Sequence, residues 1–403
     1  MLPQYPKDRS LYKNLSNMFG VRFLGNGLVT DHKHDHWHKQ RKIMDPAFSR
    51  TYLIGLLGTF NDQAEEFMKE LEKKADGETK VDMMCLLRRV TLDIIAKVAF
   101  GLELNTLYDE ETPFPHAVNM VMKGISNVRI PLFKYMPRNR QVISEIRESL
   151  RLLRHTGKQC IEQRRKAIQN EEEVPLDILT QILKNAAQEG DYDEENMLDN
   201  FVAFFVAGHE TTANQLSFTV MELGRQPDIV AKLQAEVDEV IGVKRDIAYE
   251  DLGKLKYLSQ VLKEVLRLYP PAPHTIRWTK SENIIEGVKI PANTTLINCV
   301  YAAVCHLSCH TYQNCKIKMG LVHTSWDEWK NISRMHSPSI LTDLAKINQS
   351  HTFPISHFLL DLVPVLDRCL HRWRLKWYWP SFCRGLTSSW FHHRALKFWT
   401  QEH

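Results

Sequence analysis

Thiol groups are scarce over most of this 403-residue chain, since the first 297 residues contain only Cys85 and Cys160. So few cysteines argue against a disulfide framework and are typical of a reducing compartment. No stretch of 18 apolar residues is present, so the sequence encodes no helix that would span a bilayer. The first residues also lack the basic start and apolar run of a signal peptide. A net charge of +4 is too small to indicate a nucleic-acid partner.

The composition changes sharply near residue 297. Residues 298–403 hold six of the eight cysteines, ten of the 18 histidines and seven of the nine tryptophans. The same segment has 12 basic side chains against six acidic ones, whereas the preceding part is close to neutral. Because a folded domain rarely changes character in this way, we expect two sequences of different origin to be joined there. We predict one domain over 1–297 and a divergent, poorly folded segment over 298–403.

The first part has the periodicity of a helical protein. Apolar residues recur at helical spacing, and glycine or proline ends or starts several runs. Gly101 and Gly224 are expected to end two helices, and Pro227 to start another. The expected helices are 65–74, 86–100, 145–166, 197–223, 227–240 and 258–269, with a charged linker at 169–175, a hairpin at 284–290 and a strand at 294–297. The predicted fold class is therefore mainly α with a minor β sheet.

The most distinctive segment is Ala-Gly-His-Glu-Thr-Thr at 207–212, in the middle of the most apolar helix. A buried acid beside a buried hydroxyl is costly unless both are partnered or used. Gly208 would let a flat ligand approach the backbone, and Thr211 can donate to a carbonyl one turn back. Glu210 is suited to relay protons. The alternative is a kinked core helix with satisfied polar groups.

Two further pairs share a helix face. Trp37 and Arg41 stand four residues apart, and together they offer a guanidinium and an indole N–H to a carboxylate. Glu264 and Arg267 stand three residues apart and can form an ion pair. Either pair alone fits an ordinary helix surface, and the Glu-x-x-Arg spacing also occurs at 148/151, 162/165 and 222/225.

Taken in order, these features resemble the cytochrome P-450 monooxygenases. The Leu-Tyr-Pro-Pro sequence at 268–271, about 55 residues after the 207–212 segment, matches the same family. The resemblance implies a cytochrome P-450 fold with haem as cofactor and no other metal. It implies catalytic roles for Glu210 and Thr211 in oxygen activation, which consumes protons. It further implies haem contacts from Ala207, Gly208 and Thr211, a propionate contact from Trp37 and Arg41, and a structural pair in Glu264 and Arg267.

A narrower similarity points to the cholesterol 24-hydroxylase branch. It is carried by segments 37–41, 179–183, 198–201, 233–242 and 257–264. This branch implies a sterol substrate, an NADPH-dependent flavoprotein reductase and the membrane surface of the endoplasmic reticulum. The similarity covers about residues 8–297 and starts inside the family's chain. We therefore expect the membrane anchor and the first strands to be missing, and the fold to be incomplete at both ends.

The thiolate that ligates iron in this family lies in a loop of the form Phe-x-x-Gly-x-Arg-x-Cys-x-Gly. Five of the six late cysteines match none of the four flanking positions. Cys383 matches only Gly385, with Trp379 and Lys376 at the places of the first glycine and the phenylalanine. Since a thiolate is needed to favour O–O cleavage, the sequence predicts an inactive member of the family.

Three other interpretations remain open. Cys305, Cys309 and Cys315, with His306 and His310 among them, have an irregular spacing for a zinc site. The His-rich stretch 31–38 is either a metal-binding loop or a solvated lead-in to a helix. The chain could also keep an apolar sterol pocket without competent iron, as a non-catalytic binder or a dead-end splice product.

Overall fold

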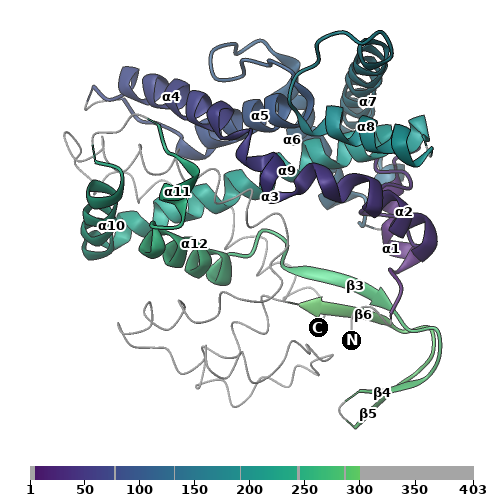
Figure 1. Cartoon of the computed structure of the whole chain (residues 1–403). Coiled ribbons are helices and arrows are strands. Elements are labelled where there is room, and N and C mark those ends of the chain that lie inside the picture. Colours follow the sequence, from purple (N-terminus) through teal and green to yellow (C-terminus); the bar gives the residue numbers. More distant parts are fainter. Residues whose placement is uncertain are drawn as a thin grey trace.

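The computed structural model describes residues 5–76, 79–130, 132–190, 192–242, 246–285 and 287–299 (Figure 1). Over these residues the chain is mainly helical, as predicted. The helices are α1 Arg9–Ser16, α2 His34–Met44, α3 Arg50–Ile54, α4 Leu57–Lys73, α5 Met83–Phe100, α6 Pro113–Asn127, α7 Arg140–Gln169, α8 Ile178–Glu189, α9 Glu194–Arg225, α10 Pro227–Val240, α11 Tyr249–Leu252 and α12 Lys256–Leu268. Short 3₁₀ helices are η2 Asp45–Phe48, η3 Phe133–Tyr135 and η4 Pro137–Asn139.

Helix ends follow local chemistry. The Asp82 side chain accepts the backbone N–H of Cys85 and caps the start of α5. Gly101 ends the same helix with a φ of 65°, a left-handed conformation that favours glycine. Asp193 caps α9 through the N–H of Asn196 in the same way. The prediction that Gly101 ends this helix is confirmed, whereas the predicted starts at 86 and 197 lie three residues after the starts of α5 and α9.

The prediction that Gly224 ends the long central helix is wrong. Helix α9 continues through Gly224 to Arg225, and the break falls at Gln226, whose backbone is extended (φ −132°, ψ 72°). Pro227 disfavours a helical conformation in the residue before it, so proline rather than glycine sets the boundary. Although α9 has 32 residues, no helix in the described part of the chain is long and apolar enough to cross a membrane.

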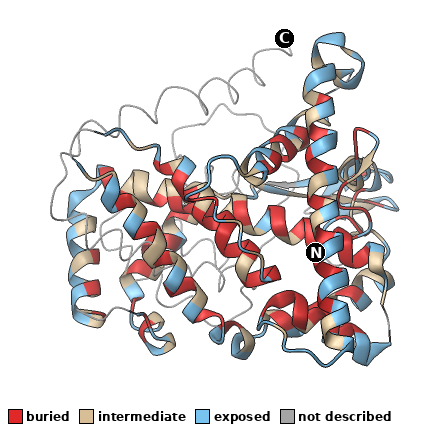
Figure 2. Cartoon of the chain, turned by 90° about the horizontal axis from the view of Figure 1, so that it is seen from above, coloured by how far each residue is buried: buried red, intermediate tan, exposed pale blue. Residues whose placement is uncertain are grey.

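The core is built around α9, which lies between α5, α7 and α12 (Figure 1). Buried residues gather along these central helices, while exposed ones lie on the outer faces (Figure 2). Phe100 of α5 packs against Phe201 and Phe205 of α9, with ring centroids 4.0 and 6.1 Å away. Burying each such ring stabilises the fold by about 1.5–3 kcal/mol, so these aromatic contacts join α5 firmly to α9.

The strands form small antiparallel pairs. They are β1 Asn17–Met18 with β2 Val21–Arg22, β3 His274–Trp278 with β6 Thr295–Cys299, and β4 Asn283–Ile285 with β5 Val288–Ile290. The β4–β5 hairpin confirms the predicted one, whereas β3 was not predicted. In the β3–β6 pair, Ile276 lies opposite Ile297, and β6 continues past residue 297 to Cys299. The rest of the predicted divergent segment lies outside the described residues.

Candidate functional site

One face of α9 is open along the distinctive segment. Ala207 is exposed, and Phe204, Gly208 and Thr211 are partly exposed. His209, by contrast, is buried in the adjoining turn. Positions 204, 207, 208 and 211 lie on one helix face because they recur every three to four residues. The structure therefore gives an otherwise apolar helix an accessible strip of small and hydroxyl side chains.

Thr211 makes the backbone contact that the sequence predicts. Its hydroxyl donates to the Ala207 carbonyl, one turn back, at 2.7 Å. Ser217 makes the equivalent bond to Ala213, also at 2.7 Å. Because α9 is continuous from Glu194 to Arg225, this bond satisfies the hydroxyl without breaking the helix. The catalytic role of Thr211 stays a prediction.

Glu210 points toward α5, where Arg88 is its partner. The Arg88 Nη2 lies 2.7 Å from the Glu210 Oε1, and the glutamate side chain is 14% exposed. The amide of Asn214 reaches the same oxygen at 3.4 Å. The Glu210 carboxylate is therefore mostly buried and paired with a guanidinium. This pairing offsets much of the free-energy cost of burying the carboxylate. Its role in proton transfer stays a prediction.

His209 is a buried polar group that the sequence interpretation left without a role. Its Nδ1 lies 3.0 Å from the Thr91 hydroxyl of α5, and its Nε2 lies 3.8 Å from the Glu210 Oε2. Burial, with a smaller effect of Arg88, lowers the pKa of His209 from 6.5 to about 3. The imidazole is therefore neutral at neutral pH. The signal that could have indicated a partner on the adjacent helix is a polar residue inside an apolar helix, but no partner was predicted for His209.

Gly208 has a packing role that the sequence did not indicate. A Cβ at this position would lie 2.6 Å from the Cδ1 and 2.8 Å from the Cγ1 of Ile95. The missing side chain therefore lets α5 approach α9 closely. This contact accounts for the glycine without a ligand, and its predicted contact with a flat cofactor stays untested.

Trp37 and Arg41 lie on α2, as expected for residues at i and i+4. The Arg41 Nε forms an ion pair with the Asp45 Oδ1 at 2.6 Å, and the arginine side chain is 32% exposed. The Lys7 Nζ lies 5.7 Å from the centroid of the Trp37 ring. The charge of the Arg41 guanidinium is therefore partly balanced by the Asp45 carboxylate.

The structure adds Lys7 and Arg277 to this pair. Lys7 pairs with Arg277 of β3 in an antiparallel bridge, and its Nζ donates to the Leu28 carbonyl at 2.6 Å. Burial first, and then the charge of Arg277, lowers the pKa of Lys7 from 10.5 to about 8. The charge of Asp31 acts on the pKa of Lys7 in the opposite direction, as the third and smallest effect. Two cations held close together favour an anion such as a carboxylate. No local sequence signal could find this pair, because its members are 270 positions apart.

Glu264 and Arg267 form a bidentate pair on α12. The Arg267 Nε and Nη2 donate to the two carboxylate oxygens at 2.7 and 2.6 Å. Both side chains are partly buried, whereas Glu222 and Arg225, with the same spacing, include an arginine at 39% exposure. The predicted pairing is confirmed. Its role in a haem-binding core stays a prediction.

The structure describes the side chains of two cysteines, Cys85 and Cys160. The buried Cys160 thiol donates to the Phe100 carbonyl at 3.4 Å, and burial raises its pKa to about 11. Cys85 is exposed. The zinc interpretation of Cys305, Cys309 and Cys315 lies outside the described residues.

The His-rich stretch 31–38 is partly helical. Helix α2 begins at His34, so the solvated lead-in is shorter than expected. Asp31 is buried and lies 2.5 Å from the Nδ1 of His36. Over the ranges that the structure describes, no group of three or more His, Cys, Asp or Glu side chains is placed to hold a metal ion.

These elements agree with one family of known proteins. The model of the Cytochrome P450 family matches residues 3–314, which includes α2, α5, α9, α12 and the strands. The chain belongs to the cytochrome P450 family. Its mainly helical architecture is that of the family's fold, and haem is the family's cofactor.

Individual proteins of known sequence match this chain at about 30% identity. Cytochrome P450 4d2 of Drosophila melanogaster is 30% identical over 321 residues, covering 72% of this chain and 61% of the relative. The protein LUTEIN DEFICIENT 5 of Arabidopsis thaliana is 31% identical over 275 residues, covering 65% and 45%. An 11-oxo-beta-amyrin 30-oxidase of Glycyrrhiza uralensis is 29% identical over 286 residues, covering 68% and 53%. The chain thus spans about half the length of these relatives.

Proposed function

We propose that this chain binds haem and derives from a sterol side-chain monooxygenase of the cholesterol 24-hydroxylase type. Haem with a thiolate ligand supplies the oxidising chemistry that such an enzyme needs. Lys7 contacts the Trp37 ring and pairs with Arg277, and Arg41 follows Trp37 by one helical turn. This set of three cations, called here the basic group around Trp37, supports the proposal most, because haem carries carboxylates that need cations. In this proposal Ala207 and Thr211 offer a small contact surface, and Glu210 relays protons.

Titration of the purified full chain with hemin, followed by its absorption spectrum, tests the cofactor proposal. We expect Arg277→Ala and Arg41→Ala each to weaken hemin binding about tenfold, since each removes a charge-assisted contact. Arg151→Ala, on the exposed side of α7, is the matched control and should leave the affinity unchanged. Equal affinities in all four proteins would contradict the proposed carboxylate site.

We also propose that the chain is not a competent monooxygenase. The sequence contains no cysteine within the family's ligand loop, and the buried Cys160 thiol stays protonated at neutral pH because its pKa is raised. The carbon-monoxide difference spectrum of the reduced, hemin-loaded chain tests this. A band typical of thiolate ligation would refute it, and a band typical of other axial ligands would support it.

The alternative function is a non-catalytic sterol binder formed by residues 1–297. The hydrophobic core of the described residues favours it, because residues between Met18 and Leu262 bury a large set of apolar side chains against one another. Limited proteolysis in the presence of cholesterol distinguishes the two outcomes. A protected fragment of about residues 1–297 that retains sterol supports a binder, whereas rapid loss throughout supports a dead-end product.

A membrane surface is the proposed location, at the endoplasmic reticulum, with an NADPH-dependent flavoprotein reductase as electron donor. The connection between α6 and α7 supports membrane contact, since Ile130, Leu132 and Tyr135 are exposed there. Residues 112–144 contain five Lys or Arg and no Asp or Glu. Exposed apolar side chains insert into the bilayer interface, and neighbouring cations are attracted to anionic lipids. Sedimentation with phosphatidylserine vesicles should recover the chain, and Leu132→Asp should reduce that recovery.

A further inference from the structure

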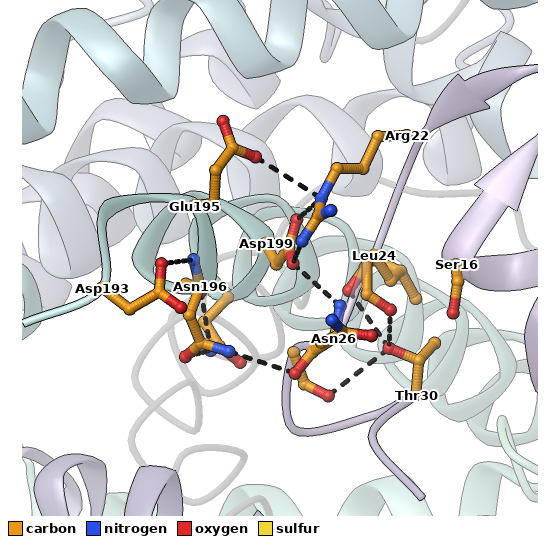
Figure 3. Close-up of polar contacts among 12 residues, drawn as sticks. Ser16, Arg22, Leu24, Asn26, Thr30, Asp193, Glu195, Asn196 and Asp199 are labelled. Carbon is orange, nitrogen blue, oxygen red and sulfur yellow. Dashed lines mark hydrogen bonds and ion pairs between the residues drawn. The ribbon is translucent and has the colours of Figure 1, made fainter. Parts of the chain in front are cut away.

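The start of α9 contains a fully buried carboxylate, Asp199, that is bound to a distant loop (Figure 3). Arg22 donates to it twice, from Nε at 2.9 Å and from Nη2 at 2.7 Å. Arg154 of α7 adds a third bond at 2.9 Å, and the backbone N–H of Asn26 a fourth at 2.8 Å. A Cβ at Gly25 would lie 2.0 Å from the Asp199 Oδ2, so the loop backbone approaches the carboxylate as closely as glycine permits.

The next residue, Asn200, binds both the same loop and helix α2. Its Oδ1 accepts the Leu28 N–H at 2.8 Å, and its Nδ2 donates to the Gln40 Oε1 at 3.1 Å. Gln40 in turn donates from its Nε2 to the Asn26 carbonyl at 2.9 Å. Asn196, one turn earlier on α9, donates to that carbonyl at 3.1 Å (Figure 3). Side chains of α9 therefore bind backbone groups of the loop at 24–31, among them the Leu28 N–H and the Asn26 carbonyl.

The position of this loop matters because of what it joins. Gln40 immediately precedes Arg41 and lies three residues after Trp37 on α2. The Leu28 carbonyl accepts the Lys7 ammonium, while the Leu28 N–H is bound by Asn200. Asn200 of α9 is therefore linked to the basic group around Trp37 in two ways. Gln40 links it to Arg41 and Trp37 on α2, and Leu28 links it to Lys7.

We infer that Asp199 and Asn200 are positioning residues for the basic group around Trp37. Asp199 and Asn200 precede Thr211 on the same helix, α9, by about 17 Å of helix rise. One helix therefore sets both the open face at 207–211 and the loop that orients Lys7 and α2. The role of the basic group in holding haem rests on the proposed function. The ordering of loop 24–31 by Asn200 does not, and it can be tested without haem.

The experiment compares Asn200→Ala with Asn61→Ala in the full chain. Asn61 is the matched control: it is a buried asparagine that holds a different loop, through the N–H and carbonyl of Ile247. Hydrogen exchange of residues 24–31 and the first turn of α2 is measured, together with hemin affinity, well below the melting temperature. Asn200→Ala should speed exchange in those segments at least tenfold and weaken hemin binding about tenfold. Asn61→Ala should change neither, although it lowers the melting temperature similarly.

Gln40→Ala keeps the bond from the Leu28 N–H to Asn200 and loses the bond between Asn200 and Gln40, so it should fall between wild type and Asn200→Ala in the exchange measurement. It also keeps the test usable if Asn200→Ala does not fold. Equal exchange in segment 24–31 for the Asn200 and Asn61 variants would overturn the inference. If the wild-type chain binds no hemin, the haem proposal fails, while the exchange measurement still decides whether Asn200 orders the loop.

Discussion

The contact between Gly208 and Ile95 gives a quantitative test of why glycine stands in the 207–212 segment. Replacing glycine by alanine within a helix gains about 1 kcal/mol of stability when space is available. Here the new Cβ would overlap both the Cγ1 and the Cδ1 of Ile95, at 2.8 and 2.6 Å. Overpacking a filled core costs about 1–3 kcal/mol, so we expect Gly208→Ala to destabilise the chain by about 0–2 kcal/mol.

The partner substitution separates packing from ligand contact. Ile95→Ala removes both overlapping atoms, and alone it should cost about 2–5 kcal/mol by leaving a cavity. In the double variant the alanine at 208 fills part of that cavity. The two effects should therefore be less than additive by about 1–3 kcal/mol.

Urea denaturation followed by circular dichroism measures these four proteins, and hemin titration gives a second measurement. If packing alone explains the glycine, the double variant recovers hemin affinity along with stability relative to the Ile95→Ala variant. Recovery of stability without hemin binding would show that a flat ligand also needs Gly208. Additive effects, or a Gly208→Ala variant more stable than wild type, would refute the packing argument.

Three further outcomes follow from single contacts. The pKa of His209 in the folded state is about 3, below its usual 6.5, so folding favours the neutral imidazole. The contribution of this imidazole to stability is full above pH 6.5 and is lost as the pH falls toward 3. The free energy of unfolding should then fall by up to about 1.4 kcal/mol per pH unit. His209→Gln should flatten the pH dependence of urea unfolding between pH 7 and 5, and an unchanged slope would contradict this. Asp177→Asn should cost about 3–5 kcal/mol in the same assay, since it leaves the buried Arg164 guanidinium, 2.5 Å away, without its charge partner. Asp45→Asn should strengthen hemin binding several-fold by releasing Arg41 from its 2.6 Å pair; weaker binding would show that Asp45 orients the arginine instead.

The sequence determined the elements whose signals are local. Asp82 and Gly101 fix the ends of α5 through their own side-chain and backbone properties, and the hairpin at 283–290 follows from its β-branched residues around Gly287. The pairing of Glu264 with Arg267 and the Thr211 bond to Ala207 were predictable for the same reason, because helical geometry places i, i+3 and i+4 together.

Only the tertiary structure decided the contacts between distant segments. The Arg88 partner of Glu210, the Ile95 contact of Gly208 and the Arg277 neighbour of Lys7 each join different elements. A helix pattern states which face is apolar, but not which side chain of another helix meets a given position, because that depends on how the whole core packs. The sequence therefore indicated the candidate residues on α9 and α2, and the packing of α5, α9 and β3 decided which side chains contact them.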